Sequence, residues 1–343
     1  MHNMAKIVTF GELMLRLSTP GNERFTQAKQ FDLCFGGGEA NVAVSLAHFG
    51  HEAVFVSKLP KNDIGDSAIK SLKSEDVKCE YIARGGNRIG IYYLETGSSI
   101  RGSKVIYDRA NSAIAESDFS DFEFEKALQN AAVFHFSGIT PALSKKCAET
   151  VKKACEVAKR LGVLVSCDLN YRKKLWTKEE ARAVMVPLIK YVDICIGNEE
   201  DFESCLGYKP EGDILKGKTD ASGYKNIFMD LKKDFDFKYI ASSLRESFSA
   251  SHNGWKGLLF DGDKFYESKH YDIYPIVDRV GSGDSFAAGL LHGLLSYDNK
   301  QKAIEFAVAA SALKHTILGD FNQVNEEEVL NLVNGDASGR VSR

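Results

Sequence analysis

Short apolar runs alternate with amphipathic stretches over most of this chain, and this pattern predicts an α/β fold. Continuous apolar runs are typical of strands buried on both faces of a mostly parallel sheet, and the amphipathic stretches predict helices covering both faces. The expected strands are Lys6–Phe10, Ala53–Val56, Ala132–Phe136, Val163–Cys167, Val192–Ile196, Phe237–Ser242, Ala250–Phe260 and Lys264–Glu267. The expected helices are Asp63–Lys73, Ser144–Leu161 with Ser144 as its cap, 283–297 and 300–317.

Residues 81–110 follow a different pattern, rich in Tyr, Ile and Gly with partial alternation. This pattern favours antiparallel strands and turns, which could form a small sheet together with part of residues 13–35. We expect one domain over residues 1–333, with a surface excursion at 208–222 and a C-terminal tail at 334–343.

Composition narrows the class of protein. The chain has 343 residues, of which 44% are hydrophobic and 27% charged, so it can build a large core. Its formal net charge of −3 argues against a nucleic-acid binder. It has no leader-like apolar segment and no apolar run of 18 residues, so we expect a cytoplasmic protein without a membrane partner. Its seven cysteines have no metal-binding spacing and predict buried free thiols.

The segment Asp278–Phe286, which reads DRVGSGDSF, is the strongest candidate for chemistry. Gly281 and Gly283 precede an apolar run that predicts a helix start, where free N–H groups can bind a phosphate anion. Asp284 lies at that start and could act as a general base, so the segment suggests phosphoryl transfer. The alternative is an ordinary turn with Asp as a helix cap.

A second glycine segment lies far upstream. Gly36, Gly37 and Gly38 run into an amphipathic helix that stops at Gly50, with the polar Asn41 in its first turn. The chain therefore has two glycine loops that each meet a helix start. No P-loop, zinc-protease or hydrolase-elbow motif is present, and position 41 breaks dinucleotide-fold spacing.

With these two motifs in this order, the chain resembles the ribokinase-like (PfkB) family of sugar kinases over roughly residues 5–333. It is most similar to members that phosphorylate 2-keto-3-deoxygluconate, a small sugar acid, at its terminal hydroxyl. Further stretches carry this resemblance: FGELMLRLS at 10–18, HFSGITP at 135–141 and DLNYRKKLW at 168–176. The resemblance implies a ribokinase-like fold with a β lid over the active site, and the cofactors ATP and Mg²⁺.

The resemblance also implies roles for individual residues. Asp284 would be the catalytic base, with the Gly281 and Gly283 loop stabilising charge on the phosphoryl group. The sugar site would comprise Gly37, Asn41, Tyr92, Tyr107, Arg109, Arg172 and Asp320. The ATP site would comprise Asn198, Ser243, Arg245, Gly281, Ser282 and Gly283, and Mg²⁺ would be organised by Glu200 or Asp201.

The sequence departs from the family pattern at several of these positions. Asp201 stands where the family's N-x-x-E motif has Glu, which leaves open which of residues 199–201 serves Mg²⁺. Arg245 replaces a glycine near the expected nucleotide, and could narrow the pocket or contact phosphate. Arg279 and Ser282 replace the usual Thr and Ala. A monovalent cation and a homodimer or higher homo-oligomer are compatible with the family but not determined.

The substrate prediction depends on Arg109 and Arg172, because the carboxylate of a keto-deoxy acid needs a cationic partner. Arg109 could instead be a solvated charge, Arg172 a structural contact at a helix start, and Tyr92 and Tyr107 ordinary strand aromatics. Two other functions therefore stay open. One is a related kinase for a neutral sugar such as fructose or ribose, and the other is a non-catalytic sugar-binding regulator.

Overall fold

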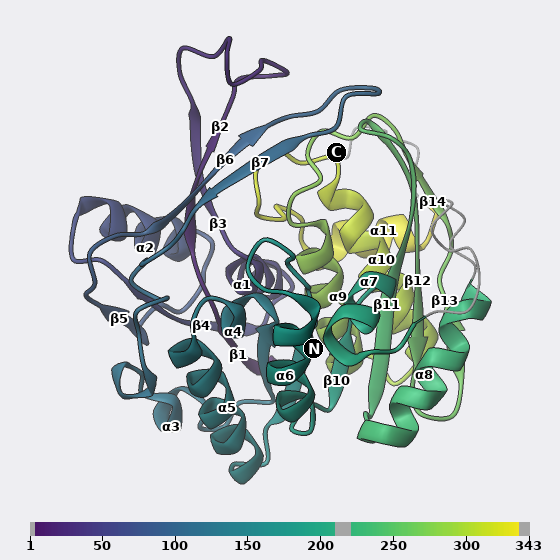
Figure 1. The fold of residues 1–343 in the computed structure, drawn as a ribbon. Coiled ribbons are helices and arrows are strands. Elements are labelled where there is room, and N and C mark those ends of the chain that lie inside the picture. The colour runs from purple at the N-terminus through teal and green to yellow at the C-terminus, as the bar shows by residue number, and fades with distance from the viewer. Residues whose placement is uncertain (1–3, 210–220, 336–343) are drawn as a thin grey trace.

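A large, mostly parallel sheet forms the centre of the molecule (Figure 1). The computed structural model describes residues 4–209 and 221–335. The strand order is β13-β12-β11-β10-β9-β8-β1-β4-β5, with β14 paired to β12. The strands are β1 Lys6–Phe10, β4 Glu52–Leu59, β5 Ile82–Arg84, β8 Val133–Ser137, β9 Leu164–Asp168, β10 Ile194–Ile196, β11 Tyr239–Ser249, β12 His252–Phe260, β13 Phe265–Glu267 and β14 Tyr271–Ile273.

Neighbouring strands from β5 to β11 run parallel, whereas β12 is antiparallel to β11, β13 and β14. The sheet is thus mostly parallel, as the continuous apolar runs predicted. Successive side chains of one strand enter opposite cores: on β4, Ala53 and Phe55 lie in one core, and Val54 and Val56 in the other. This alternation explains why the strand reads as apolar without interruption.

Helices cover both faces of this sheet. One core contains α1, α2, α9, α10 and α11, and the other contains α3, α5, α6 and α8. The helices are α1 Gly38–His48, α2 Asp63–Ser74, α3 Phe124–Ala127, α4 Ile139–Ala142, α5 Lys145–Arg160, α6 Lys178–Ile189, α7 Glu199–Asp201, α8 Ala221–Phe235, α9 Ser282–Ser296, α10 Lys300–Lys314 and α11 Glu326–Val333. The hydroxyl of Ser144 accepts the Cys147 N–H and caps α5 as predicted.

A second, four-stranded sheet with the order β3-β2-β6-β7 stands out from the body (Figure 1). Its strands are β2 Met14–Ser18, β3 Asp32–Gly36, β6 Gly90–Glu95 and β7 Lys104–Asp108. The two segments expected to share a small sheet therefore do so. The expectation of antiparallel strands throughout 81–110 was wrong for β5, which pairs in parallel with β4 after the crossover helix α2. We refer to this second sheet as the lid.

The expected excursion at 208–222 and tail at 334–343 fall mostly outside the described residues. All seven cysteines are free, and six of them are buried. Within residues 4–209 and 221–335, no helix combines the length and apolar character needed to cross a membrane.

Candidate active site

The start of α9 carries the strongest candidate chemistry. Gly281 is the residue that caps this helix, with φ +85°, and a Cβ there would lie 2.2 Å from the backbone oxygen of Asp320. Only glycine suits this backbone conformation and close approach. A Cβ at Gly283 would meet no atom within 4 Å, so open space lies beside the first turn. The free N–H groups and positive dipole end of α9 face this space, as a phosphate site requires.

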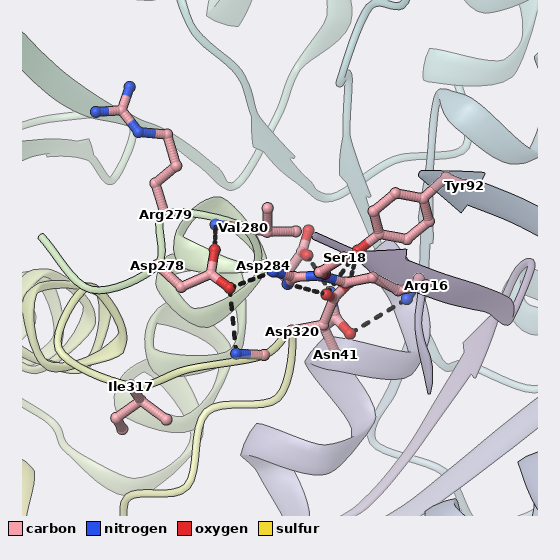
Figure 2. Close-up of polar contacts among 12 residues, drawn as sticks. Arg16, Ser18, Asn41, Tyr92, Asp278, Arg279, Val280, Asp284, Ile317 and Asp320 are labelled. Atoms are coloured by element: carbon pink, nitrogen blue, oxygen red, sulfur yellow. Dashed lines mark hydrogen bonds and ion pairs between the residues drawn. The ribbon is translucent and has the colours of Figure 1, made fainter. Parts of the chain in front are cut away.

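Asp284 is half-buried in that first turn and is held by a residue from the other glycine motif. The Asn41 Nδ2 donates to Asp284 Oδ2 at 2.7 Å, and a Cβ on Gly38 would lie 3.5 Å from Asp284 Oδ1 (Figure 2). Burial raises the pKa of Asp284 to about 7, against the opposing effects of the Asn41 hydrogen bond and the Arg172 charge. A carboxyl with a pKa near neutral is well suited to accept a proton from a hydroxyl.

The N-terminus of α1 is fixed so that Asn41 can reach Asp284. Gly37 caps α1, its N–H donates to Asn41 Oδ1 at 3.2 Å, and a Cβ at Gly37 would collide with the Glu12 carbonyl oxygen. The buried Glu39 carboxylate accepts hydrogen bonds from Ser137 at the end of β8 and from Thr140 in α4, just beyond it. These contacts anchor the helix start to the carboxyl end of the central sheet, the edge at which open α/β sheets bind ligands.

Further polar residues follow β9 at the same edge. Burial raises the pKa of Asp168 well above its ordinary value, and the carboxylates of Asp201 and Asp284 add to this effect. The charge of Arg172 lowers the pKa of all three carboxyl groups, so its guanidinium lies within electrostatic range of them. Arg172 is exposed, and its side chain forms no hydrogen bond or ion pair within the described parts of the chain. Arg172 is therefore a cation available to a ligand beside Asp284.

Asn198 and Asp201 form a reciprocal helix cap rather than an open pair of ligands. The Asn198 Oδ1 accepts the Asp201 N–H, Asp201 Oδ2 accepts the Asn198 N–H, and Asp201 Oδ1 accepts the Tyr171 N–H. Both carboxylate oxygens of the buried Asp201 are thus occupied by backbone amides. Glu200 is exposed, and among the described residues no cluster of three or more His, Cys, Asp or Glu side chains could hold a metal ion.

The predicted nucleotide residues lie on β11 and beside the α9 loop. Ser243 is half-buried and Arg245 is exposed, and both stand on the strand that pairs with β12. Arg279, one turn before α9, donates from Nη2 to the Ala250 carbonyl at 2.7 Å and to the Ser249 carbonyl at 3.3 Å. Burial lowers the pKa of Arg279, and the nearby charge of Arg245 adds to this effect. Two arginines therefore make this end of the loop positive.

Arg109 is paired within the protein. Its Nε donates to Glu12 Oε2 at 2.8 Å, and its Nη2 binds the same oxygen, while Ser112 Oγ donates to Glu12 Oε1 at 2.7 Å. Arg109 is buried, so it is not a solvated surface charge. Its guanidinium also lies over the ring of Tyr107, 5.3 Å from the ring centroid. Arg109 thus has part of its donor set committed, whereas Arg172 does not.

Tyr92 and Asp320 belong to a buried polar network that joins the lid to the body (Figure 2). The Tyr92 hydroxyl contacts both Asp320 carboxylate oxygens at 2.6 and 2.7 Å. Arg16, on lid strand β2, donates to Asp320 Oδ1 at 2.8 Å and to Asp278 Oδ2 at 2.5 Å. Asp320 also packs behind Gly281, so this network supports the α9 loop from the side of the lid.

Comparison with known proteins agrees with this geometry. The model of the pfkB family carbohydrate kinases matches residues 4–231 and 253–324. The chain belongs to the pfkB family of carbohydrate kinases. A 2-dehydro-3-deoxygluconokinase structure from Thermotoga maritima shares 51% identity with this family member, with a TM-score of 0.93 and coverage of 97% and 99% of the two chains.

Two curated relatives cover nearly the same length. The 2-dehydro-3-deoxygalactonokinase of Haloferax volcanii is 32% identical over 98% of both chains. The 2-dehydro-3-deoxygluconokinase of Bacillus subtilis is 28% identical over 94% of this pfkB chain and 93% of its own. Both the family prediction and the ribokinase-like fold prediction are therefore confirmed.

Three buried residues at the site had not been predicted from the sequence. Arg16 reads as one charged position between apolar neighbours on β2, Glu39 as a first-turn acid of α1, and Lys314 as the last charge of α10. All three are almost fully buried in this pfkB kinase. The unbroken apolar residues beside Arg16 were the one available signal, because a charge among them needs a buried partner.

Proposed function

We propose that this kinase transfers the γ-phosphoryl group of ATP to the terminal hydroxyl of 2-keto-3-deoxygluconate, giving 2-keto-3-deoxy-6-phosphogluconate. The observation that carries the proposal is the 2.7 Å hydrogen bond from Asn41 to Asp284, which brings the two glycine motifs together. It joins the N-termini of α1 and α9 beside the open space at Gly283. Full-length similarity to the Thermotoga maritima 2-dehydro-3-deoxygluconokinase supports the same reaction.

Asp284 and the backbone at the start of α9 have different roles in this transfer. Asp284 takes the proton of the attacking hydroxyl as the new oxygen–phosphorus bond forms and the bond between that phosphorus and the ADP oxygen breaks. The N–H groups at the start of α9 stabilise the charge on the transferred group, an effect worth on the order of 10²–10³ in rate for each such donor. Asp284 must be ionised to serve as this base.

Mg²⁺ bound with ATP would neutralise phosphate charge. Exposed Glu200 suits this role better than Asp201, whose oxygens accept backbone N–H groups. Magnesium keeps several waters, so the lack of a ligand cage among the described residues is compatible with it. We expect the nucleotide along Ser243, Arg245 and the α9 loop, where Arg245 and Arg279 supply positive charge.

The sugar acid would lie under the lid, with its carboxylate at Arg172 and the remaining donors of Arg109. Arg172 has an uncommitted guanidinium close to Asp284, which favours an acidic sugar over a neutral one. Tyr107 borders this region through its contact with Arg109. Exposed Leu33 and Ile106 on the lid are compatible with the expected homo-oligomer, which stays a prediction.

A coupled assay of ADP release with ATP and Mg²⁺ tests the function. The panel is 2-keto-3-deoxygluconate, 2-keto-3-deoxygalactonate, fructose, ribose and gluconate. We expect kcat/KM for the keto-deoxy acids to exceed that for fructose and ribose at least about tenfold, because one charge-assisted contact is worth about 1.5–3 kcal/mol. Asp284→Asn should lower kcat by about 10²–10⁴ while remaining folded.

Asp298→Asn is a matched control for that variant, because Asp298 is an exposed carboxylate just beyond the other end of α9. Turnover mainly on fructose or ribose would show that the proposed substrate is wrong and that the protein is still a sugar kinase. Near wild-type kcat in Asp284→Asn would remove Asp284 as the base. No turnover on any sugar, with sugar binding intact, would favour the non-catalytic regulator.

A further inference from the structure

A fully buried lysine lies beneath the loop that caps α9. Lys314, the last residue of α10, has an exposed fraction of 0%, and its Nζ donates to the Ile317 carbonyl at 3.0 Å. A Cβ placed on Gly281 would lie 3.4 Å from Lys314 Cε. The side chain therefore runs directly under the turn that presents the first N–H groups of α9.

The ammonium group is placed among carboxylates without a close ion pair. Burial lowers the pKa of Lys314, while the charges of Asp278, Asp320 and Asp284 raise it. Within residues 4–209 and 221–335, no carboxylate oxygen lies within the 4 Å of a salt bridge to it, and Ile317 is its one hydrogen-bond acceptor. A methionine would fill this space without the desolvation cost of a charge, so packing alone does not explain a lysine here.

The Asp278 and Asp320 carboxylates and the Ile317 carbonyl, which lie around the same loop, already have partners. Asp278 Oδ1 accepts the Val280 N–H at 3.0 Å, and Asp278 Oδ2 accepts Arg16 and the Gly319 N–H. The Asp320 carboxylate contacts Arg16 and Tyr92, and the Ile317 carbonyl accepts Lys314. A monovalent metal ion at this place would have to displace the Lys314 ammonium or compete with these contacts for the same oxygen atoms.

We propose that Lys314 is the built-in cation of this site: its side chain supports the α9 loop from beneath Gly281 and its ammonium adds positive charge behind the phosphoryl group, so the enzyme needs no added monovalent cation. Lys314 is a positioning residue, because it acts through the loop and through its field rather than by contact with the reacting atoms. This inference rests on the proposed kinase reaction. It assigns to Lys314 the role that a bound monovalent cation could otherwise have at this site.

The first test measures ADP release by the wild-type enzyme in a buffer of large organic cations. Potassium, sodium or ammonium chloride is added against a matched choline chloride control. We expect kcat to change by less than about twofold in any of these salts. Activation of tenfold or more by one of them would overturn the inference, and this test requires no variant to fold.

The second test uses Lys314→Met and Lys314→Ala, with Lys233→Met at an exposed position of α8 as the control. We expect Lys314→Met to lower kcat about tenfold or more with a sugar KM within about threefold of wild type. Ammonium or potassium should restore part of the activity of Lys314→Ala, since the vacated space can admit a cation. Unchanged kcat in folded Lys314→Met would overturn the inference.

Calorimetric binding of Mg·ATP without sugar separates this inference from the proposed function. If no sugar in the panel is phosphorylated, the proposed function fails, yet ATP affinity can still be compared among these variants. We expect ATP to bind several-fold more weakly to Lys314→Met than to Lys233→Met. Equal affinities in the two variants would reject the role of Lys314 independently of the substrate.

Discussion

At the scale of a single residue, the surroundings of Asp284 explain why it is suited to act as a base. Its carboxyl is half-buried, accepts a hydrogen bond from Asn41, and has a pKa raised to about 7 by burial. The ionised form is the one that can take a proton from the substrate. Activity and stability should therefore depend on pH in opposite directions through this one group.

We predict that kcat/KM rises about tenfold per pH unit below about pH 7 and levels off above it. Because the folded-state pKa lies above the unfolded value, the wild type loses stability relative to Asp284→Asn as pH rises from about 4 to 7. The Tm of Asp284→Asn should exceed that of wild type at pH 8, and the difference should vanish below pH 4. A flat rate profile from pH 6 to 8 would contradict the assignment.

Arg172 provides a second prediction at this scale. Its guanidinium has no partner in the described residues and lies near Asp284, so Arg172→Met should raise KM for the sugar acid about 10–100-fold, the loss of one charge-assisted hydrogen bond. The adjacent exposed Lys173→Met is the control. Steady-state kinetics with the sugar acid measure the effect, and equal KM values in the two variants would count against this role.

Arg109 is a poorer test of carboxylate binding. Its side chain is paired with the buried Glu12, and breaking such a pair leaves an uncompensated charge that costs about 3–5 kcal/mol of stability. A loss of activity in an Arg109 variant would therefore mix substrate binding with unfolding. Arg172 is exposed and separates the two effects.

At the scale of elements, two helix starts converge at one point. α1 and α9 are about 240 positions apart in the chain but pack against each other, and Asn41 of one contacts Asp284 of the other. Glycine runs and apolar periodicity were sufficient to predict both helices. The predicted start of the later helix, about residue 283, was one residue late, because the left-handed Gly281 is the cap and Ser282 is already helical.

Two hairpins contact each other near the segment that leads into α9 (Figure 1). The lid hairpin between β6 and β7 reaches the tip of the β11–β12 hairpin, where the Ala250 N–H donates to the Ser99 carbonyl at 2.7 Å. The Ser99 N–H donates to Ser251 Oγ at 3.0 Å. Arg279 holds the carbonyls of Ser249 and Ala250, so the lid, this tip and the α9 loop form one connected path.

We predict that Ser251→Ala loosens this connection. Loss of one hydrogen bond of about 0.5–1.5 kcal/mol should raise the sugar KM about 2–10-fold and speed hydrogen exchange of the Ser99 amide. Ser103→Ala is the matched control, because the Ser103 hydroxyl accepts the Gly97 N–H within the lid loop and makes no hydrogen bond to the body among the described residues. Exchange and KM that change equally in both variants would show that the connection has no separate role.

At the scale of the whole molecule, buried charge ties the lid to the body. Arg16 on β2 contacts Asp278 before α9 and Asp320 after α10, three segments that are far apart in the sequence. These charges lie in the interior, where removing one partner leaves the others uncompensated. Behind the α9 loop they join Lys314 in a single cluster of charged groups, so lid position and loop geometry are set together.

The sequence alone determined the fold class, the positions of most strands and helices, the family and the position of Asp284 at a helix start, because local periodicity and short glycine motifs indicate these features directly. It could not determine that β5 joins the central sheet, that Asp201 is a helix cap, or that Arg109 pairs with Glu12. The sequence also could not determine that Arg16, Glu39 and Lys314 are buried. Only the tertiary structure decided these points, since the partner of a charge lies wherever the fold brings a distant segment.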